Sequence, residues 1–278
     1  MVSRLAGALL RAVLMMVLVL APSLLVPGLG TDAQQTVALV ALFVGALTFA
    51  EYNSECPGLI EFRDAPPFNR MRFLLLAATL LALSLIERGR FEPNTLTQLV
   101  EAVGTLIGQA MDFPYSPVRL ATQALIPGAP EADVAAVRTA AGMAYLTSLI
   151  ALFFFSFQMR MGNWPRRGQT FNVWINLPTF DPTSASDIVA RLERDARINI
   201  ALGFLLPFIA PALARLVMGG IDPAGLLTPH SLIWTMTSWA FLPASLFMRG
   251  IAMLRVAQMV RNKRRASLTE TDRSLAAA

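Results

Sequence analysis

Six long runs of apolar residues follow one another along the chain, separated by shorter stretches rich in polar, charged, proline and glycine residues. An α-helix needs about 20 predominantly apolar residues to cross the hydrocarbon core of a bilayer. The pattern therefore predicts an all-α integral membrane protein, a polytopic bundle of about six transmembrane helices. The predicted spans are residues 12–29, 36–50, 73–86, 140–161, 198–218 and 232–253.

The second and third runs, 36–50 and 73–86, are short. Each holds about 15 apolar residues, or roughly 22 Å of helix at 1.5 Å per residue, whereas the hydrocarbon core is roughly 30 Å thick. We expect these spans to extend over polar flanks such as Gln34, Gln35 and Arg72, whose side chains reach the headgroups. A re-entrant pair that does not cross the membrane is the alternative.

Residues 87–139, between the third and fourth spans, contain helical signals of their own. Apolar residues recur at helical spacing between positions 94 and 111, opposite a polar face. Ser116 and Pro117 have the order of an N-cap and the first residue of a short helix. We expect an amphipathic helical insertion on the outer side, which lies flat on the membrane or packs over the bundle.

The segment between the fourth and fifth spans, residues 162–186, mixes aromatic residues with proline, asparagine and glycine. This composition predicts a structured cytosolic loop that Trp164 and Trp174 anchor at the membrane interface. The chain becomes basic after the last span. We therefore predict a single transmembrane domain over residues 1–260 and a flexible basic tail over residues 261–278.

The composition supports a membrane location and predicts an orientation. Of the 278 residues, 55% are hydrophobic and 15% are charged, which is typical of membrane chains. Basic residues near span ends stay on the cytosolic side, and placing both termini in the cytosol puts 18 of the 23 basic residues in cytosolic segments. Every basic residue except Lys263 is arginine, as GC-rich codons produce. We predict the bacterial inner (cytoplasmic) membrane, with the lipid bilayer and its anionic headgroups as partners rather than nucleic acid.

Residues that carry most catalytic chemistry are scarce. The one cysteine, Cys56, and the one histidine, His230, fall on opposite sides of the bilayer in the predicted topology, so they cannot form a nucleophile and its base. No phosphate-binding glycine loop, GxSxG elbow or HExxH pair occurs. We expect no catalytic residue, no cofactor and no metal site. Gly104 and Gly108 fit the GxxxG spacing of paired helices, but they fall in the outer insertion, where the signal is weak.

One charged stretch, residues 51–73, lies between the second and third spans. Its four acids are nearly balanced by three arginines, so the favoured interpretation is a self-neutralising turn at the membrane surface. A pocket or interaction surface is the alternative, and it requires Glu61, Asp64 and Arg70 to converge. The candidate residues on the cytosolic face are Glu61, Asp64, Arg70, Arg72, Trp164 and Trp174.

Three classes of function remain. The middle of each predicted span lacks the ionisable residues that ion-coupled carriers hold inside the membrane. We therefore expect an accessory, assembly or scaffold component of an inner-membrane protein complex, with partner subunits and without chemistry of its own. A transporter or channel for a neutral or apolar solute is the alternative, because Pro207 and Pro211 are candidate breaks in the fifth span. A lipid-active membrane enzyme is the second alternative.

Overall fold

The computed structural model describes residues 2–55, 57–63, 66–161, 164, 172, 176–178, 180, 187–218, 221 and 223–276. These residues are mainly helical, and among them no strand forms beyond one isolated bridge between Leu125 and Ile221. Six helices are long and apolar enough to cross a membrane, which confirms the predicted all-α membrane fold. The helices are α1 (Val2–Leu25), α2 (Thr31–Asn53), α3 (Pro66–Gly89), α4 (Thr95–Ala110), α5 (Pro117–Gln123), α6 (Glu131–Met161), α8 (Ile188–Met218), α9 (Pro223–Leu226) and α10 (Pro229–Ala276).

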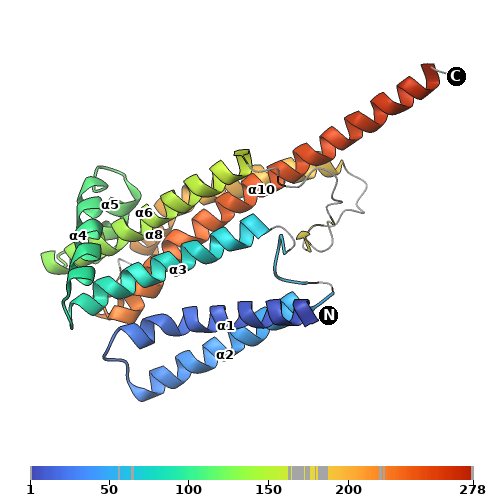
Figure 1. Ribbon diagram of the computed structural model, residues 1–278. Helices are drawn as coiled ribbons and strands as arrows, with labels where there is room; N and C mark the ends of the chain where they lie inside the picture. The colour runs from blue at the N-terminus through green and yellow to red at the C-terminus, as the bar shows by residue number, and fades with distance from the viewer. Residues whose placement is uncertain are drawn as a thin grey trace.

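The long helices run alongside one another, and both chain termini lie at the same end of the bundle (Figure 1). We call this end the terminal end, and the end that carries α4 and α5 the opposite end. Helix α10 packs most extensively on α8 and also contacts α6 and α3. Helices α1 and α2 form a hairpin that reaches this core mainly through α1 and α3. Two clusters of buried apolar residues fill the interior.

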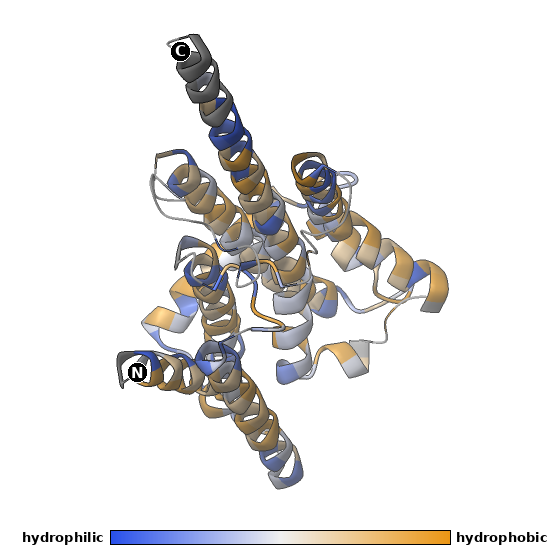
Figure 2. Cartoon of the chain, turned by 90° about the vertical axis from the view of Figure 1, so that its right-hand side faces the viewer, coloured by the Kyte–Doolittle hydropathy of each residue, from blue (hydrophilic) through white to orange (hydrophobic). Residues whose placement is uncertain are grey.

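The two spans that are short in the sequence become full-length helices. Helix α2 has 23 residues and α3 has 24, each roughly 35 Å long at 1.5 Å per residue. They gain this length by including the polar flanks, so that Gln34, Gln35 and Arg72 are all helical. Figure 2 shows the long helices coloured mainly as hydrophobic, with hydrophilic residues gathered towards their ends. Each of the two is one continuous helix that is long and apolar enough to cross a membrane.

The basic segment predicted to be a flexible tail is helical instead, because α10 continues to Ala276 and extends beyond the bundle (Figure 1). Arginine, lysine and alanine are good helix formers. Ion pairs at the start of α8 add support, since Arg261 pairs with Glu193 of α8 and Arg264 pairs at 2.7 Å with Asp187, the residue before α8. The hydrogen bond from Arg264 lowers the pKa of the Asp187 carboxyl below its ordinary value. Tertiary pairing therefore overrides the polar composition.

Helices α8 and α10 approach closely at two glycines. A Cβ atom on Gly203 of α8 would lie 2.7 Å from the carbonyl oxygen of Pro243 in α10. A Cβ atom on Gly250 of α10 would lie 2.7 Å from the carbonyl oxygen of Ala196 in α8. Small residues let membrane helices pack backbone to backbone, where dispersion contacts are densest. The two glycines therefore fix how closely these helices can pack.

Helix α4 crosses α6 near the opposite end of the bundle (Figure 1). It begins at the N-cap Asn94, whose side chain accepts a hydrogen bond from the Thr97 backbone. A Cβ atom on Gly142 of α6 would lie 2.5 Å from the Gly108 Cα atom. The GxxxG pair, given little weight in the sequence, therefore forms the contact between α4 and α6. The residues that α4 buries are Thr97, Gly104 and Gly108.

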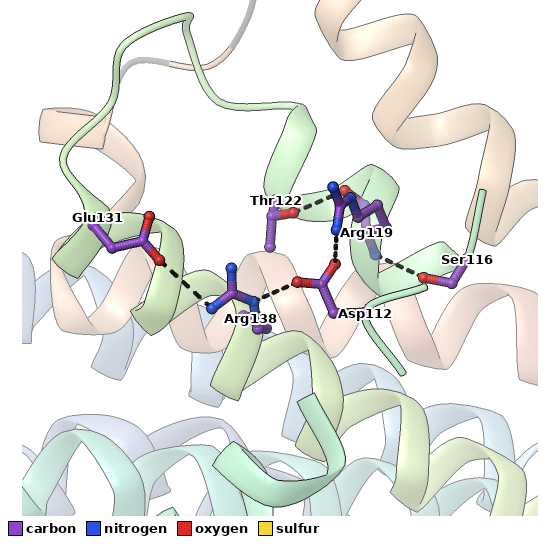
Figure 3. A network of polar contacts seen from close by, with 6 residues as sticks. All are labelled: Asp112, Ser116, Arg119, Thr122, Glu131 and Arg138. Atoms are coloured by element: carbon purple, nitrogen blue, oxygen red, sulfur yellow. Dashed lines mark hydrogen bonds and ion pairs between the residues drawn. The ribbon is translucent and has the colours of Figure 1, made fainter. Parts of the chain in front are cut away.

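An ion-pair network fastens the segment between α4 and α6 onto α6 (Figure 3). The carboxylate of Asp112 lies 2.8 Å from Nε of Arg138 and 3.3 Å from a terminal nitrogen of Arg119. Ser116 caps α5 as the sequence predicts, because its hydroxyl accepts a hydrogen bond from the Arg119 backbone. Glu131 lies 3.7 Å from Arg138 at the start of α6. Charged residues here hold the backbone in place.

Candidate functional site

Three of the predicted site residues meet at the terminal end of the bundle, where the loop between α2 and α3 contacts α10. We call this region the Glu61 junction and define it by residues from four segments of the chain. Three of its members, Phe62, Phe68 and Arg249, were not among the predicted candidates. The junction consists of Glu61, Phe62, Phe68, Arg72, Trp164 and Arg249.

The centre of the junction is a two-pronged ion pair between Glu61 and Arg249. Nε of Arg249 donates to one carboxylate oxygen at 2.5 Å, and a terminal nitrogen donates to the other at 2.7 Å. The two side chains are only 12% and 25% exposed. Such a fork-to-fork contact is charge-assisted and directional. It therefore fastens the loop between α2 and α3 to the middle of α10, 188 residues further along the chain.

Aromatic rings form the wall of the junction. Phe62 is fully buried and adopts a left-handed backbone conformation with φ of 52°. Its ring centroid lies 4.6 Å from that of Phe68 and 6.1 Å from that of Trp164. Its backbone N–H donates to the carbonyl of Asn176 at 2.7 Å. Bulky residues rarely adopt this conformation, which costs of order 1–3 kcal/mol, so the surrounding contacts must hold it.

The loop before Glu61 is organised by another carboxylate, that of Glu51. Its oxygen accepts hydrogen bonds from the backbone N–H groups of Gly58, Leu59 and Ile60, at 3.1, 2.8 and 3.0 Å. Asn69 closes the other side, because its amide donates to the carbonyls of Glu61 and Phe62. Both acids therefore stabilise the fold of the loop, as expected for a structured turn rather than a pair of reactive carboxylates.

Arg72 is partly buried beside the ion pair. Its guanidinium lies over the ring of Phe68, at 5.2 Å from the centroid, and over that of Phe241, at 5.7 Å. Its Nε atom is buried and has no hydrogen-bond partner among the described residues. Cation–π contacts stabilise the charge, but they give the buried Nε–H no acceptor.

Of the remaining predicted residues on this face, the structure describes Arg70, which is exposed on α3 and is not part of the junction. Asp64 and Trp174 lie outside the described residues, as does Cys56. The pocket hypothesis required Glu61, Asp64 and Arg70 to converge, and among the described residues Glu61 has a bidentate partner in Arg249. A signal for this partner existed in the sequence, because an arginine inside an apolar span needs a counter-charge.

The candidate helix break in α8 is continuous helix through Pro207 and Pro211. Both prolines are buried. The indole nitrogen of Trp239 in α10 donates a hydrogen bond to the Pro207 carbonyl at 3.2 Å. The side chain of a neighbouring helix therefore satisfies a backbone acceptor that a broken helix in a carrier would use to bind solute or ion.

A shallow hollow lies at the opposite end, between the start of α6 and the segment around α9. Asp133, Ala224 and Thr228 are among its lining residues. Among the described residues, no group of three or more His, Cys, Asp or Glu side chains is placed to hold a metal ion. The described residues around this hollow therefore show no arrangement that indicates a reaction.

Comparison with protein-family models, with curated proteins and with solved structures gives no match for this chain. The class of the protein therefore follows from its own structure: a multi-pass helical membrane protein with six helices able to span the bilayer.

Proposed function

We propose that this protein is an accessory, assembly or scaffold subunit of a membrane protein complex and performs no chemistry of its own. The observation that carries the proposal is the bidentate contact between Glu61 and Arg249. The candidate carboxylate of the charged loop is occupied by an arginine and enclosed by aromatic rings. Its role is to hold the loop in one shape on the bundle.

The weak attachment of α2 supports a partner subunit. This helix packs chiefly on α1, whereas α6 and α10 each contact several long helices. Large apolar side chains cover its free side, with Leu39 67% and Phe43 69% exposed. Lipid or a partner helix can cover such a surface. A partner helix is the proposed occupant of part of it, because α2 makes little other contact with the bundle.

The orientation belongs to the same proposal. Both termini lie at one end of the bundle, and the arginine-rich segments favour the cytosol of a bacterial cell for that end. Helix α4 then lies at the outer surface of the inner membrane. Its buried side holds Gly104 and Gly108, while Leu96, Leu99 and Leu106 are exposed on another side and are proposed to enter the lipid.

The described residues offer little support for the two other classes of function. The transporter alternative relied on a broken α8, and that helix continues through both prolines with the Pro207 carbonyl already bonded. The lipid-active enzyme alternative relied on Glu61, Asp64 and Arg70 converging at one pocket, and Glu61 is held by Arg249 while Arg70 is exposed.

The test is co-purification of the intact protein from its native membrane in mild detergent, followed by cross-linking and mass spectrometry. We expect a partner subunit in stoichiometric amount, cross-linked to α2. The substitution Ala46→Trp on the exposed side of α2 should displace it, whereas the control Ala212→Trp on the exposed side of α8 should not. A monodisperse chain without any protein partner would contradict the proposal.

A further inference from the structure

At the terminal end of the bundle, Tyr52 of α2 contacts Arg11 of α1, and further arginines lie within electrostatic range of its hydroxyl. The guanidinium of Arg11, on α1, lies over the Tyr52 ring at 4.7 Å from its centroid. The Tyr52 hydroxyl is also within electrostatic range of Arg63, in the loop, and of Arg72, on α3. Helix α2 ends here, so cations from three elements converge at the place where the α1–α2 hairpin meets α3.

The nearby carboxylates are already engaged elsewhere. Glu61 is held by both prongs of Arg249, and Glu51 accepts the backbone N–H groups of its own loop. Arg11 donates to the backbone carbonyl of Gly7, which carries no charge. Among the described residues, neither Arg11 nor Arg72 forms an ion pair with an acid. The acid within electrostatic range of Arg72 is Glu61, which pairs directly with Arg249, so one carboxylate is shared between two arginines.

The position and hydrogen bonding of Arg72 also indicate an anion site. It lies roughly 9 Å into α3 at 1.5 Å per residue, between the rings of Phe68 and Phe241. Its buried Nε atom has no acceptor among the described residues. A buried donor without an acceptor is costly, and an arginine fork matches the oxygens of a phosphate group better than any other side chain does.

The surroundings favour a lipid over a soluble anion. The cluster lies at the ends of three helices that are long and apolar enough to span a membrane, which is the depth of the phospholipid headgroups. Apolar side chains of α1 and α2 next to it are exposed, among them Leu10, Leu14 and Leu47. They offer a surface for acyl chains directly beside the charged groups. Basic pockets between membrane helices commonly hold anionic headgroups.

We propose that Arg11, Tyr52 and Arg72 form a binding site for the phosphate group of one anionic phospholipid, held between the α1–α2 hairpin and α3. The guanidinium of Arg72 donates to the phosphate oxygens, and Arg11 supplies the second charge from the membrane side. The bound lipid fills the contact between the hairpin and the core. The site does not depend on a partner subunit, so its test is separate from that of the proposed function.

The test uses the full chain in nanodiscs of phosphatidylcholine with a minor fraction of phosphatidylglycerol, and native mass spectrometry counts the lipids that remain bound. We expect one phosphatidylglycerol per chain to be retained in preference to phosphatidylcholine. Arg72→Gln should lower this retention about tenfold, the value of one strong charge-assisted contact. The control Arg70→Gln removes the same charge from the exposed side of the same helix and should leave retention unchanged.

An Arg11 variant and added inorganic phosphate provide two further measurements. Arg11→Gln changes an exposed position, so the chain should fold, and retention should fall severalfold. Inorganic phosphate added to discs of pure phosphatidylcholine should not shift thermal unfolding, because the acyl chains contribute to binding. Equal losses in the Arg70 and Arg72 variants, unchanged retention in Arg11→Gln, or binding of inorganic phosphate as tight as that of the lipid would each overturn the proposal.

Discussion

Trp239 of α10 donates a hydrogen bond to the Pro207 carbonyl of α8, which Pro211 leaves without its helical donor. In a regular helix the carbonyl of Pro207 would accept from the N–H of residue 211, but residue 211 is a proline and has no N–H. The indole N–H of Trp239 donates to this carbonyl at 3.2 Å. A side chain of α10 therefore satisfies a backbone carbonyl of α8, and α8 stays helical through the two prolines.

Trp239→Phe should destabilise the protein by about 1–3 kcal/mol, because it leaves a buried carbonyl without its donor while keeping an aromatic ring. Trp234→Phe is the matched control on the same helix, where no hydrogen bond of the indole is present among the described residues. Unfolding in a denaturing detergent, followed by tryptophan fluorescence or circular dichroism, measures both. Equal effects of the two substitutions would show that the hydrogen bond contributes nothing.

Breaking the Glu61–Arg249 pair should loosen the loop from α10. We expect Glu61→Gln to cost about 2 kcal/mol, between the values for an exposed and a buried pair, since the two groups remain partly exposed. A double-mutant cycle with Arg249→Gln should give a coupling energy of about 1 kcal/mol or more.

Glu55→Gln is the control for this cycle, because Glu55 is exposed in the same loop. It should change the free energy of unfolding by less than about 0.5 kcal/mol. Strict additivity of the Glu61 and Arg249 substitutions would contradict a direct contact between them.

Gly108→Ala should weaken the docking of α4 on α6. The added Cβ would lie 2.6 Å from the carbonyl oxygen of Arg138, which is backbone and cannot rotate away. Overpacking of this kind costs typically about 1–3 kcal/mol, and hydrogen exchange of α4 should rise. Gly225→Ala is the control, since nothing lies within 4 Å of a Cβ there; the docking interpretation fails if both variants protect α4 equally.

The proposed orientation can be tested with single cysteines in a Cys56→Ser background. Glu55→Cys marks the terminal end and Glu92→Cys marks the segment after α3, and both positions are exposed. In right-side-out vesicles, a membrane-impermeant thiol reagent should label only the Glu92→Cys variant. The reverse pattern would place the termini outside the cell.

Local signals in the sequence are sufficient to mark the membrane-spanning helices. Apolar length alone marks six spans, and the order Ser116-Pro117 marks where helix α5 begins. These signals are local, because a helix closes its own backbone hydrogen bonds and a bilayer demands a fixed apolar length. The predicted spans 36–50 and 73–86 therefore needed only to be lengthened over their polar flanks.

Which residues contact one another depends on how whole helices pack together. Glu61 pairs with Arg249, 188 residues further along the chain, and Trp239 donates to the carbonyl of Pro207. Gly108 packs against Gly142 because the close crossing of the two backbones leaves no room for a side chain. The same reason explains the helical tail, where pairing with α8 overrides polar composition. Such contacts depend on the rotation and crossing point of whole helices, and hydrophobic periodicity leaves both open when lipid and core are equally apolar.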